Sequence, residues 1–378
     1  MTDLYKGIKL VDEKVIMETE NDGSFEICDY MKIDRIEKNI DTKEIKALIK
    51  YKTFYDTNEE IIIPRVDYMN HNNLIKFQGA GMDIRTDNVK FVVWHLANEE
   101  RKAITLLKHS GLGFDKYEGK VIYKHYKAIG IDSTYCGPYL IKPKGDEETV
   151  KKLIDEEILT YTPSKFILLV SLSAATISYL SEVMDTTVIL VHLVGNSTTG
   201  KSTICKFAIS LFGYPGIKDN GLFFTYNATD NAIMKRMEGG YGVPFSIDEL
   251  SMSDSRKNNM AYKLFNGRNK DRLNKDSSQK ESDGWLGSIF TNGEKSLIKS
   301  SSKNVGIQLR VIEAANIQWT KSAEHAEKIN EVIMNNYGHI GPKFAEFIMS
   351  KDKGDLKERY EKSVNYLMKV FEKKISKR

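Results

Sequence analysis

Residues 195–202 read GNSTTGKS, and this short run constrains the fold more than any other part of the chain. It fits the pattern G-x-x-x-x-G-K-[ST] in full. An apolar, β-branched run precedes it at residues 186–194, and an apolar helical pattern follows it at residues 202–212. Because such a loop joins a buried strand to a helix, the sequence predicts an α/β domain with three layers. A chance match in a Gly/Ser/Thr-rich turn would lack both neighbours.

The residue types of this loop suit a polyphosphate. Gly195 and Gly200 let the backbone bend so that its N–H groups face inward, where they and the helix N-terminus hold phosphates. Lys201 is expected to reach the β and γ phosphates of ATP, and the Ser202 hydroxyl to bind Mg²⁺. The other residues predicted to contact the nucleotide are Asn196, Ser197, Thr198, Thr199 and Thr203.

Two later strand patterns end in polar residues that suit ATP hydrolysis. The apolar run at residues 241–250 ends in Asp248 and Glu249. The aspartate can hold Mg²⁺ through water and the glutamate can polarise the attacking water, which favours hydrolysis over a kinase reaction. The pattern at residues 285–293 ends in Asn292, whose amide can hold the same water or the γ-phosphate. Each group also has an ordinary structural interpretation. Asp248 and Glu249 could form an acidic turn after a core strand, and Asn292 could form a turn with Gly293.

Arg310 lies within an apolar strand pattern at residues 306–317. An arginine inside such a run is costly to bury unless it pairs. We therefore expect either a salt bridge within the monomer or a finger that reaches the nucleotide of a neighbouring subunit. The residues alone favour neither interpretation.

A polar stretch rich in Lys and Arg occupies residues 268–285. Surface loops commonly have this composition, so a solvated loop is one interpretation. The other is a hairpin that lines a central pore and binds DNA phosphates. The lysines that would make these contacts are Lys270, Lys275 and Lys280.

Residues 1–145 are rich in strand patterns. The runs at residues 43–54 and 59–66 flank a turn and predict a hairpin, and a helix is predicted at residues 89–107. Composition changes sharply at residues 142–150, and we place a domain boundary there. We therefore predict an N-terminal mixed α+β domain at residues 1–145, for which DNA or partner binding is a candidate role that the sequence does not establish.

The ATPase domain is predicted at residues 146–349. Its most apolar segment, residues 166–180, is interrupted by serine and threonine and is too short for a membrane span, so we expect a buried helix. The pair Thr162-Pro163 is a helix start signal. Residues 350–378 are predicted to form a basic helical tail, since from Lys351 onward ten Lys and Arg face five Asp and Glu.

The overall composition excludes several classes of protein. The net charge is only +4, so a nucleic-acid surface has to be a local patch rather than a property of the whole chain. Three scattered cysteines exclude a disulfide framework and a Cys-rich zinc site, which favours a reduced, cytoplasmic setting. The first residues are polar and do not resemble a secretory signal.

These elements, in this order and spacing, resemble the helicase-like family catalogued as domain of unknown function 927 (DUF927). The resemblance covers roughly residues 25–349. Its most specific parts are the GNSTTGKST loop and the segments TYNATDNAI, SIDEL and IFTNGE. Weaker landmarks are FEICDYMKIDRI, IIIPRVDY and NNYGHIGPKFAEFI. Members of the family include replication proteins of phages, plasmids, staphylococcal cassette chromosomes and pathogenicity islands.

The resemblance implies a P-loop ATPase of the AAA+ type, related to minichromosome-maintenance and superfamily III helicases. In such enzymes an arginine finger often lies in the strand after the sensor asparagine, which contacts the γ-phosphate, and Arg310 lies at that place. A basic hairpin just before the strand of the sensor asparagine touches DNA in such enzymes, which favours Lys275 and Lys280 as DNA contacts. Thr229 and Asp230 lie in a typical segment of the family, without a role that we can assign. Several relatives continue into a winged-helix DNA-binding domain, whereas the sequence here stops at Arg378 with the basic tail. It is either truncated or a shorter member of the family, and the resemblance does not extend to origin recognition.

We therefore expect a DNA helicase or translocase of a phage or mobile genetic element, which acts in DNA replication as a ring, expected to be a hexamer. Its cofactors would be ATP and Mg²⁺, and its partners single-stranded or forked DNA and a primase or replication initiator. The expected metal ligands are Ser202 and Asp248. The expected catalytic residues are Lys201, Asp248, Glu249, Asn292 and, from a neighbouring subunit, Arg310.

Two alternatives remain open at this stage. A P-loop kinase or NTP-dependent switch would stay monomeric and would not respond to DNA. A DNA-stimulated ATPase that assembles on DNA or recruits partners would hydrolyse ATP without unwinding.

Overall fold

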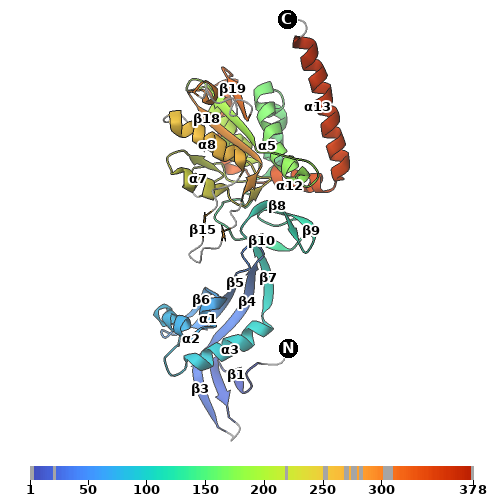
Figure 1. Ribbon diagram of the computed structural model, residues 1–378. Coiled ribbons are helices and arrows are strands. Elements are labelled where there is room, and N and C mark those ends of the chain that lie inside the picture. The colour runs from blue at the N-terminus through green and yellow to red at the C-terminus, as the bar shows by residue number, and fades with distance from the viewer. Residues whose placement is uncertain are drawn as a thin grey trace. The chain divides into compact units, whose positions relative to one another are not determined.

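The computed structural model describes residues 4–19, 23–217, 220–249, 254–267, 272–273, 279–280, 284–300 and 310–375. By its contacts the chain divides into two compact units, Met1–Ser110 and Gly111–Arg378 (Figure 1). This division falls earlier in the chain than the boundary predicted at residue 145. The reason is that strand β8 (Leu112–Tyr117) pairs in parallel with β13 (Gly240–Tyr241), which joins the residues after 110 to the second unit.

The first unit is built on mostly antiparallel strands and one long helix. Three strands form a small sheet: β1 (Ile8–Val11), β2 (Lys14–Glu18) and β3 (Ser24–Asp29). A second sheet contains, in this order, β7 (Ile104–His109), β4 (Met31–Asn39), β5 (Ile45–Lys52) and β6 (Asn58–Pro64). The short helices after β6 are α1 (Arg65–Tyr68), α2 (His71–Leu74) and the 3-10 turn η1 (Ile75–Ala80).

The sequence predictions for this unit are largely confirmed. Strands β5 and β6 form the predicted antiparallel hairpin. The predicted helix at residues 89–107 is α3 (Val89–Lys102), which packs against β4 (Figure 1). Its predicted end was wrong, because Ile104 and the residues after it extend and pair in parallel with β4. An apolar run suits a helix and a strand equally well, and here the tertiary pairing decides.

The second unit contains a parallel sheet whose strands lie in the order β12-β14-β18-β11-β19. These strands are β11 (Ile189–Val194), β12 (Phe223–Thr225), β14 (Phe245–Asp248), β18 (Ser288–Gly293) and β19 (Val311–Ala315). The central strands β11 and β18 are almost wholly buried. Continuous apolar runs of this kind belong to strands covered on both faces.

Helices pack on this sheet in two groups. The first group, whose members contact each other, is α5 (Thr162–Leu180) and α6 (Lys201–Ser210). The second group is α7 (Asp230–Met237), α8 (Asp254–Asn266) and α9 (Leu297–Ser300). Figure 1 shows α5 and α8 on opposite sides of β18. The second unit is therefore a mixed α/β fold in which helices of both groups contact the parallel sheet.

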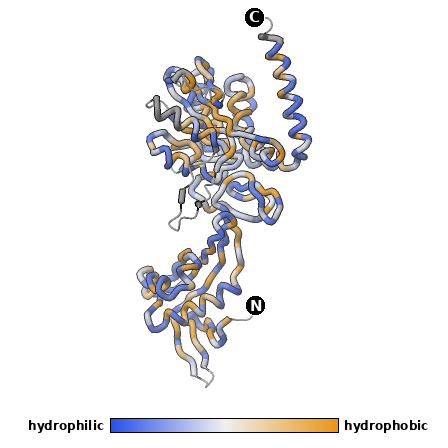
Figure 2. Tube along the Cα trace, in the orientation of Figure 1, coloured by the Kyte–Doolittle hydropathy of each residue, from blue (hydrophilic) through white to orange (hydrophobic). Residues whose placement is uncertain are grey.

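Helix α5 confirms the buried helix predicted at residues 166–180. By length and apolarity it is the one helix in the described ranges that could cross a membrane, but 56% of that window is buried inside the protein. Buried serines punctuate it, and the Ser171 hydroxyl donates to the Ala208 carbonyl at 2.6 Å. Figure 2 shows apolar segments gathered in the middle of this unit. The predicted start signal at Thr162-Pro163 does mark the beginning of the helix, but Thr162 is its first residue rather than its cap: the N-cap is Tyr161, which makes no side-chain cap hydrogen bond.

The remaining elements surround this core. A further sheet has the order β17-β13-β8-β9, with β9 at Lys120–Lys124 and β17 at Trp285–Leu286. The other elements of this unit are β10 (Ser133–Tyr135), α4 (Glu147–Leu153), the π-turn η2 (Ile154–Ile158), β15 (Arg272–Leu273), β16 (Gln279–Lys280), α11 (Ala323–Asn335), α12 (Ile340–Met349) and α13 (Lys353–Ile375). The basic tail predicted at residues 350–378 is therefore helical through most of its length.

Candidate nucleotide-binding site

The parallel sheet brings three strand ends together at one edge. Register pairs Val194 of β11 with Gly293 of β18, and Ile247 of β14 with Thr291 of β18. The residues that follow these strands therefore share the carboxyl edge of the sheet, which is where ligands bind in open α/β sheets. The phosphate loop, residues 195–202, leaves this edge and runs directly into α6.

The phosphate loop requires glycine at position 200. Gly200 has φ +82°, and a Cβ built there would lie 2.5 Å from the Thr320 Oγ1. Thr198 also has a positive φ, of 73°. The loop is tied to the segment after β19, because the Trp319 N–H donates to the Thr199 carbonyl at 2.8 Å. These constraints hold the backbone in a shape that most side chains could not adopt.

Lys201 folds back along this loop. Its Nζ donates to the carbonyls of Gly195 at 2.8 Å and Asn196 at 2.6 Å. Burial lowers the pKa of Lys201, and the carboxylate of Glu294 opposes that shift. The ammonium group is thus bound by neutral acceptors and stays half-buried at the mouth of the loop.

Ser202, Asp248 and Asn292 form one hydrogen-bonded group. The Ser202 hydroxyl donates to the Asp248 Oδ1 at 3.1 Å, and the Asn292 amide donates to the same oxygen at 2.6 Å. The Asn292 Nδ2 also lies 3.3 Å from the Ser202 Oγ. A hydroxyl and a carboxylate are oxygen ligands of the kind that Mg²⁺ takes, so these residues fit that ion.

Glu249 is held by its backbone rather than by its side chain. Its N–H donates to the Asn292 Oδ1 at 3.0 Å, and its φ is +57°. A glutamate in the left-handed region costs about 1 kcal/mol or more, so its surroundings must impose the conformation. The side chain is exposed and is free to act on a ligand at the edge of the sheet.

The side chains of Lys201, Ser202, Asp248, Glu249 and Asn292 line one cavity of about 520 Å³. Its walls are the phosphate loop, the ends of β14 and β18, and the first turns of α11. The lining residues are Ser197, Thr198, Gly200, Lys201, Ser202, Thr203, Asp248, Glu249, Asn292, Gly293, Glu294, Ala323, Ala326 and Glu327. Of the predicted nucleotide contacts, Gly195, Asn196 and Thr199 shape the loop without lining this cavity.

Several residues that the sequence did not single out support the site. Glu294 accepts a hydrogen bond from the Ser197 hydroxyl at 3.0 Å. Glu313 caps α9, since its carboxylate accepts from the N–H groups of Leu297 and Ile298 at 2.8 Å and 3.1 Å. The sequence could have indicated Glu294, because it directly follows the Asn-Gly pair that ends the predicted strand. Glu313 gave no signal, because a lone acid within a strand pattern has many uses.

Thr229 and Asp230 have structural roles here. Thr229 is the N-cap of α7, and its hydroxyl accepts from the Ala232 N–H at 3.3 Å. Asp230 forms an ion pair of 2.8 Å with Lys263 of α8. Thr229 therefore caps α7, and Asp230 ties α7 to α8 within the second group of helices.

Arg310 is not buried within a strand as its apolar neighbours suggested. It is exposed, in a turn just before β19 begins at Val311. Its guanidinium lies over the rings of Tyr262 and Phe265, at 5.3 Å and 5.2 Å from their centroids. The cost of burial that motivated a salt bridge does not arise, because cation–π contacts at the surface hold the charge.

The basic stretch at residues 268–285 is described only in part. β15 and β16 pair as antiparallel strands, with Arg272 opposite Lys280. Lys270 and Lys275 lie outside the described residues, and so does the side chain of Lys280. The backbone pairing is that of a hairpin.

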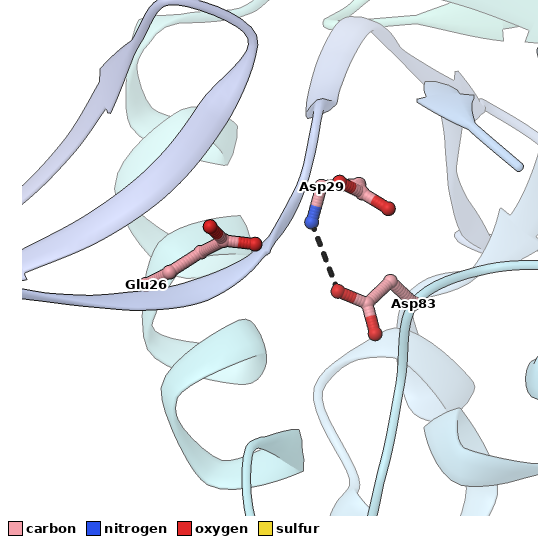
Figure 3. A group of neighbouring side chains, drawn as sticks. All are labelled: Glu26, Asp29 and Asp83. Carbon is pink, nitrogen blue, oxygen red and sulfur yellow. Dashed lines mark hydrogen bonds between the residues drawn. The ribbon is translucent and has the colours of Figure 1, made fainter. Parts of the chain in front are cut away.

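One cluster of carboxylates in the first unit has the spacing of a metal site. The ligand oxygens of Glu26, Asp29 and Asp83 lie within 4.8 Å of one another (Figure 3). Lys14 pairs with Glu26 and Asp29, and Arg85 pairs with Asp83. Because cations of the chain already balance these charges, we assign no metal there.

Comparisons with known proteins agree with this architecture. A family described as a domain of unknown function, DUF927, matches residues 6–284. Among solved structures, one described as "SCCmec type IV Cch - active helicase" has a TM-score of 0.77 and 20% sequence identity, over 96% of this chain and 68% of that one. That likeness shows a shared fold. No curated protein matches the sequence.

Proposed function

This chain belongs to the DUF927 family, and from that premise we propose that it is an ATP-hydrolysing motor of the AAA+ type that moves along or opens DNA. The observation that carries the proposal is the meeting of Lys201, Ser202 and Asp248 with Glu249 and Asn292 around one cavity. Loop, acid pair and amide come from three different strand ends, so their convergence is a property of the fold. The order of the five parallel strands, with helices on both sides, supports the three-layer AAA+ assignment.

In the proposed reaction each side chain has a separate task. The backbone of the phosphate loop and the Lys201 ammonium bind the phosphates of ATP. Glu249 orients and polarises the attacking water, while Asn292 fixes the Glu249 backbone and the Asp248 carboxylate. Ser202 and Asp248 would hold Mg²⁺, which neutralises developing charge on the phosphates when bound.

We propose that the site is completed by a neighbouring copy of the chain in a ring, expected to be a hexamer. The exposure of Arg310 supports this role, because an exposed guanidinium can reach a nucleotide bound by another subunit. The contacts of Arg310 with Tyr262 and Phe265 would hold it in place for that purpose. A salt bridge within the monomer has no support in the described residues.

DNA is the proposed substrate on which the motor acts. The antiparallel pairing of β15 and β16 supports a basic hairpin, with Lys270, Lys275 and Lys280 as the proposed phosphate contacts in a central pore. The shared fold with a structure described as an active helicase supports unwinding. We further propose a cytoplasmic role in replication of a phage or mobile element, on single-stranded or forked DNA, with a primase or initiator as partner.

A strand-displacement assay tests this function. The wild-type chain should separate a forked duplex when ATP and Mg²⁺ are present, and Lys201→Ala should not. ATPase rate with and without single-stranded DNA, together with sizing in ATP, separates the alternatives. An ATPase rate that DNA stimulates, without unwinding, would point to an ATPase that only assembles on DNA or recruits partners. A monomer whose ATPase rate does not change with DNA would point to a solitary NTPase.

A further inference from the structure

Glu294 places a negative charge beside a loop that is suited to phosphate. It follows Asn292-Gly293 at the end of β18, is exposed, and lines the same cavity as Lys201. Its Oε1 accepts from the Ser197 hydroxyl at 3.0 Å, across 97 residues of chain. Its charge also acts on Lys201. Burial lowers the pKa of Lys201, and the Glu294 carboxylate is the charge that most strongly opposes this lowering. The reaction proposed above gives this carboxylate no task.

Glu294 lines the same cavity as Lys201, Glu249 and Asn292, the groups that the proposed function arranges around the terminal phosphate of ATP. The attacking water has to reach that phosphate from Glu249, if the proposed function is right. The Glu249 N–H is bound to Asn292, and Glu294 is the second residue after that asparagine. A diphosphate lacks this terminal phosphate.

The terminal phosphate and Glu294 compete for the same donor. A serine hydroxyl has a single hydrogen to give, and the Ser197 hydroxyl now gives it to Glu294. A phosphate that enters the loop can accept that hydrogen only if the carboxylate gives it up. Two anions on one donor also repel each other, so the carboxylate has to turn away.

We propose, on the basis of the function proposed above, that Glu294 is a specificity-determining residue that opposes triphosphate more than diphosphate. Displacement of the carboxylate by the terminal phosphate sets the affinity of the site for ATP relative to ADP. Because an exposed hydrogen bond of this kind contributes little to stability, its effect on binding selectivity is separable from any effect on folding.

The test compares the affinities of the full chain for ADP and for the β,γ-imido analogue of ATP, each with Mg²⁺, by calorimetric titration. Glu294→Gln keeps the size of the side chain and removes its charge. We expect it to bind the triphosphate analogue about tenfold more tightly, as follows from one charge removed near a phosphate at a partly screened site. Its affinity for ADP should change by less than about twofold.

Glu327→Gln is the matched control. Glu327 lines the same cavity from α11 and is also exposed, so its loss removes one charge without touching the Ser197 hydroxyl. We expect it to change both affinities alike. In a Ser197→Ala background, Glu294→Gln should increase the affinity for the triphosphate analogue by a smaller factor, because the hydroxyl donor that Glu294 and the phosphate share is gone.

The outcomes separate this inference from the proposed function. Equal shifts for both nucleotides in Glu294→Gln, or no shift, would overturn the inference while nucleotide binding stands. If the wild-type chain binds neither nucleotide, the proposed function fails and this inference fails with it. Glu294→Ala serves as the second variant should the glutamine chain not fold.

Discussion

The first unit and the edge of the parallel sheet in the second unit treat their charges in opposite ways. In the first unit charged side chains pair with each other on and beside the strands, as Lys50 does with Asp34 at 2.7 Å and Arg65 with Glu100 at 2.7 Å. At the edge of the parallel sheet, Lys201 binds two backbone carbonyls and Asp248 binds a hydroxyl and an amide. No ion pair is recorded for either residue within the described ranges.

The contrast identifies where a ligand can supply the missing charge. A paired charge is neutralised by the chain itself, whereas a charge held by neutral dipoles still attracts a ligand of opposite sign. An ammonium and a carboxylate held in this way suit a polyanion and a cation together. The comparison therefore predicts that changes at the sheet edge affect binding and catalysis, and that matched changes in the first unit affect stability alone.

The largest expected effect is that of Lys201→Ala. Loss of the ammonium that we propose binds the phosphates of ATP should lower ATP turnover by about a hundredfold or more. The melting temperature should hardly change, because the side chain donates only to exposed or half-buried parts of the loop. Turnover is measured with a coupled ATPase assay and folding by calorimetric melting.

Lys50→Ala provides the control for that change. It breaks an ion pair of the first unit and should leave turnover within about twofold of the wild type, since exposed pairs contribute little. A loss of turnover in Lys50→Ala as deep as that in Lys201→Ala would contradict the comparison.

The second effect concerns two buried asparagines. Asn292 is 2% exposed and Asn98 is 1% exposed, and each joins several groups by hydrogen bonds. Replacement of either by alanine leaves buried polar groups unsatisfied and should cost about 1 to 3 kcal/mol of unfolding free energy. Only Asn292→Ala should also reduce turnover, by about a hundredfold, because it releases Asp248 and Glu249.

Denaturant unfolding and single-turnover hydrolysis measure the two quantities separately. Asn292→Asp is a further check, since it keeps an acceptor for the Glu249 N–H but places a second charge beside Asp248. If the Asn98→Ala chain lost turnover while it remained folded, the division of labour between the units would be wrong.

The third effect is the strain at Gly200. A Cβ there meets Thr320 at 2.5 Å and the φ of +82° is unfavourable for alanine, so Gly200→Ala should destabilise the second unit by about 1 to 3 kcal/mol. Gly79→Ala in the first unit is the control, because nothing lies within 4 Å of its Cβ position. It should be neutral or slightly stabilising. Urea unfolding measures the unfolding free energy of both variants. Equal losses of unfolding free energy in the two variants would refute the steric argument.

The sequence predicted the strand ends and the loop because their signals are local. The glycines, the lysine and the acid pair each follow an apolar run directly, so their place on a parallel sheet follows from chain order. The sequence alone did not predict contacts between segments that are far apart in the chain. The bond from Ser197 to Glu294 depends on β18 lying beside β11, which no local pattern specifies.

The errors have the same origin. The helix predicted at residues 89–107 took in β7, because Ile104 and Leu106 suit either structure until β4 pairs with them. Arg310 was placed inside a strand because five apolar or small residues follow within its run, whereas β19 begins one residue later. The boundary predicted at residue 145 missed the pairing of β8 with β13, which is made between segments far apart in the chain.

The smallest expected effect is a dependence of stability on pH at His325. This residue of α11 is buried, its Nδ1 accepts from the Lys321 N–H at 2.9 Å, and burial lowers its pKa from the usual 6.5. Because the folded state disfavours the protonated ring, its contribution to stability is complete above about pH 6.5 and is lost as the pH falls toward the depressed pKa. Melting temperature from about pH 7.5 to about pH 5.5 should therefore fall less in His325→Gln than in the wild type, by about 1 to 3 °C. His71→Gln, which changes an exposed histidine of the first unit, should follow the wild-type curve, and parallel curves for all three chains would remove His325 as the source.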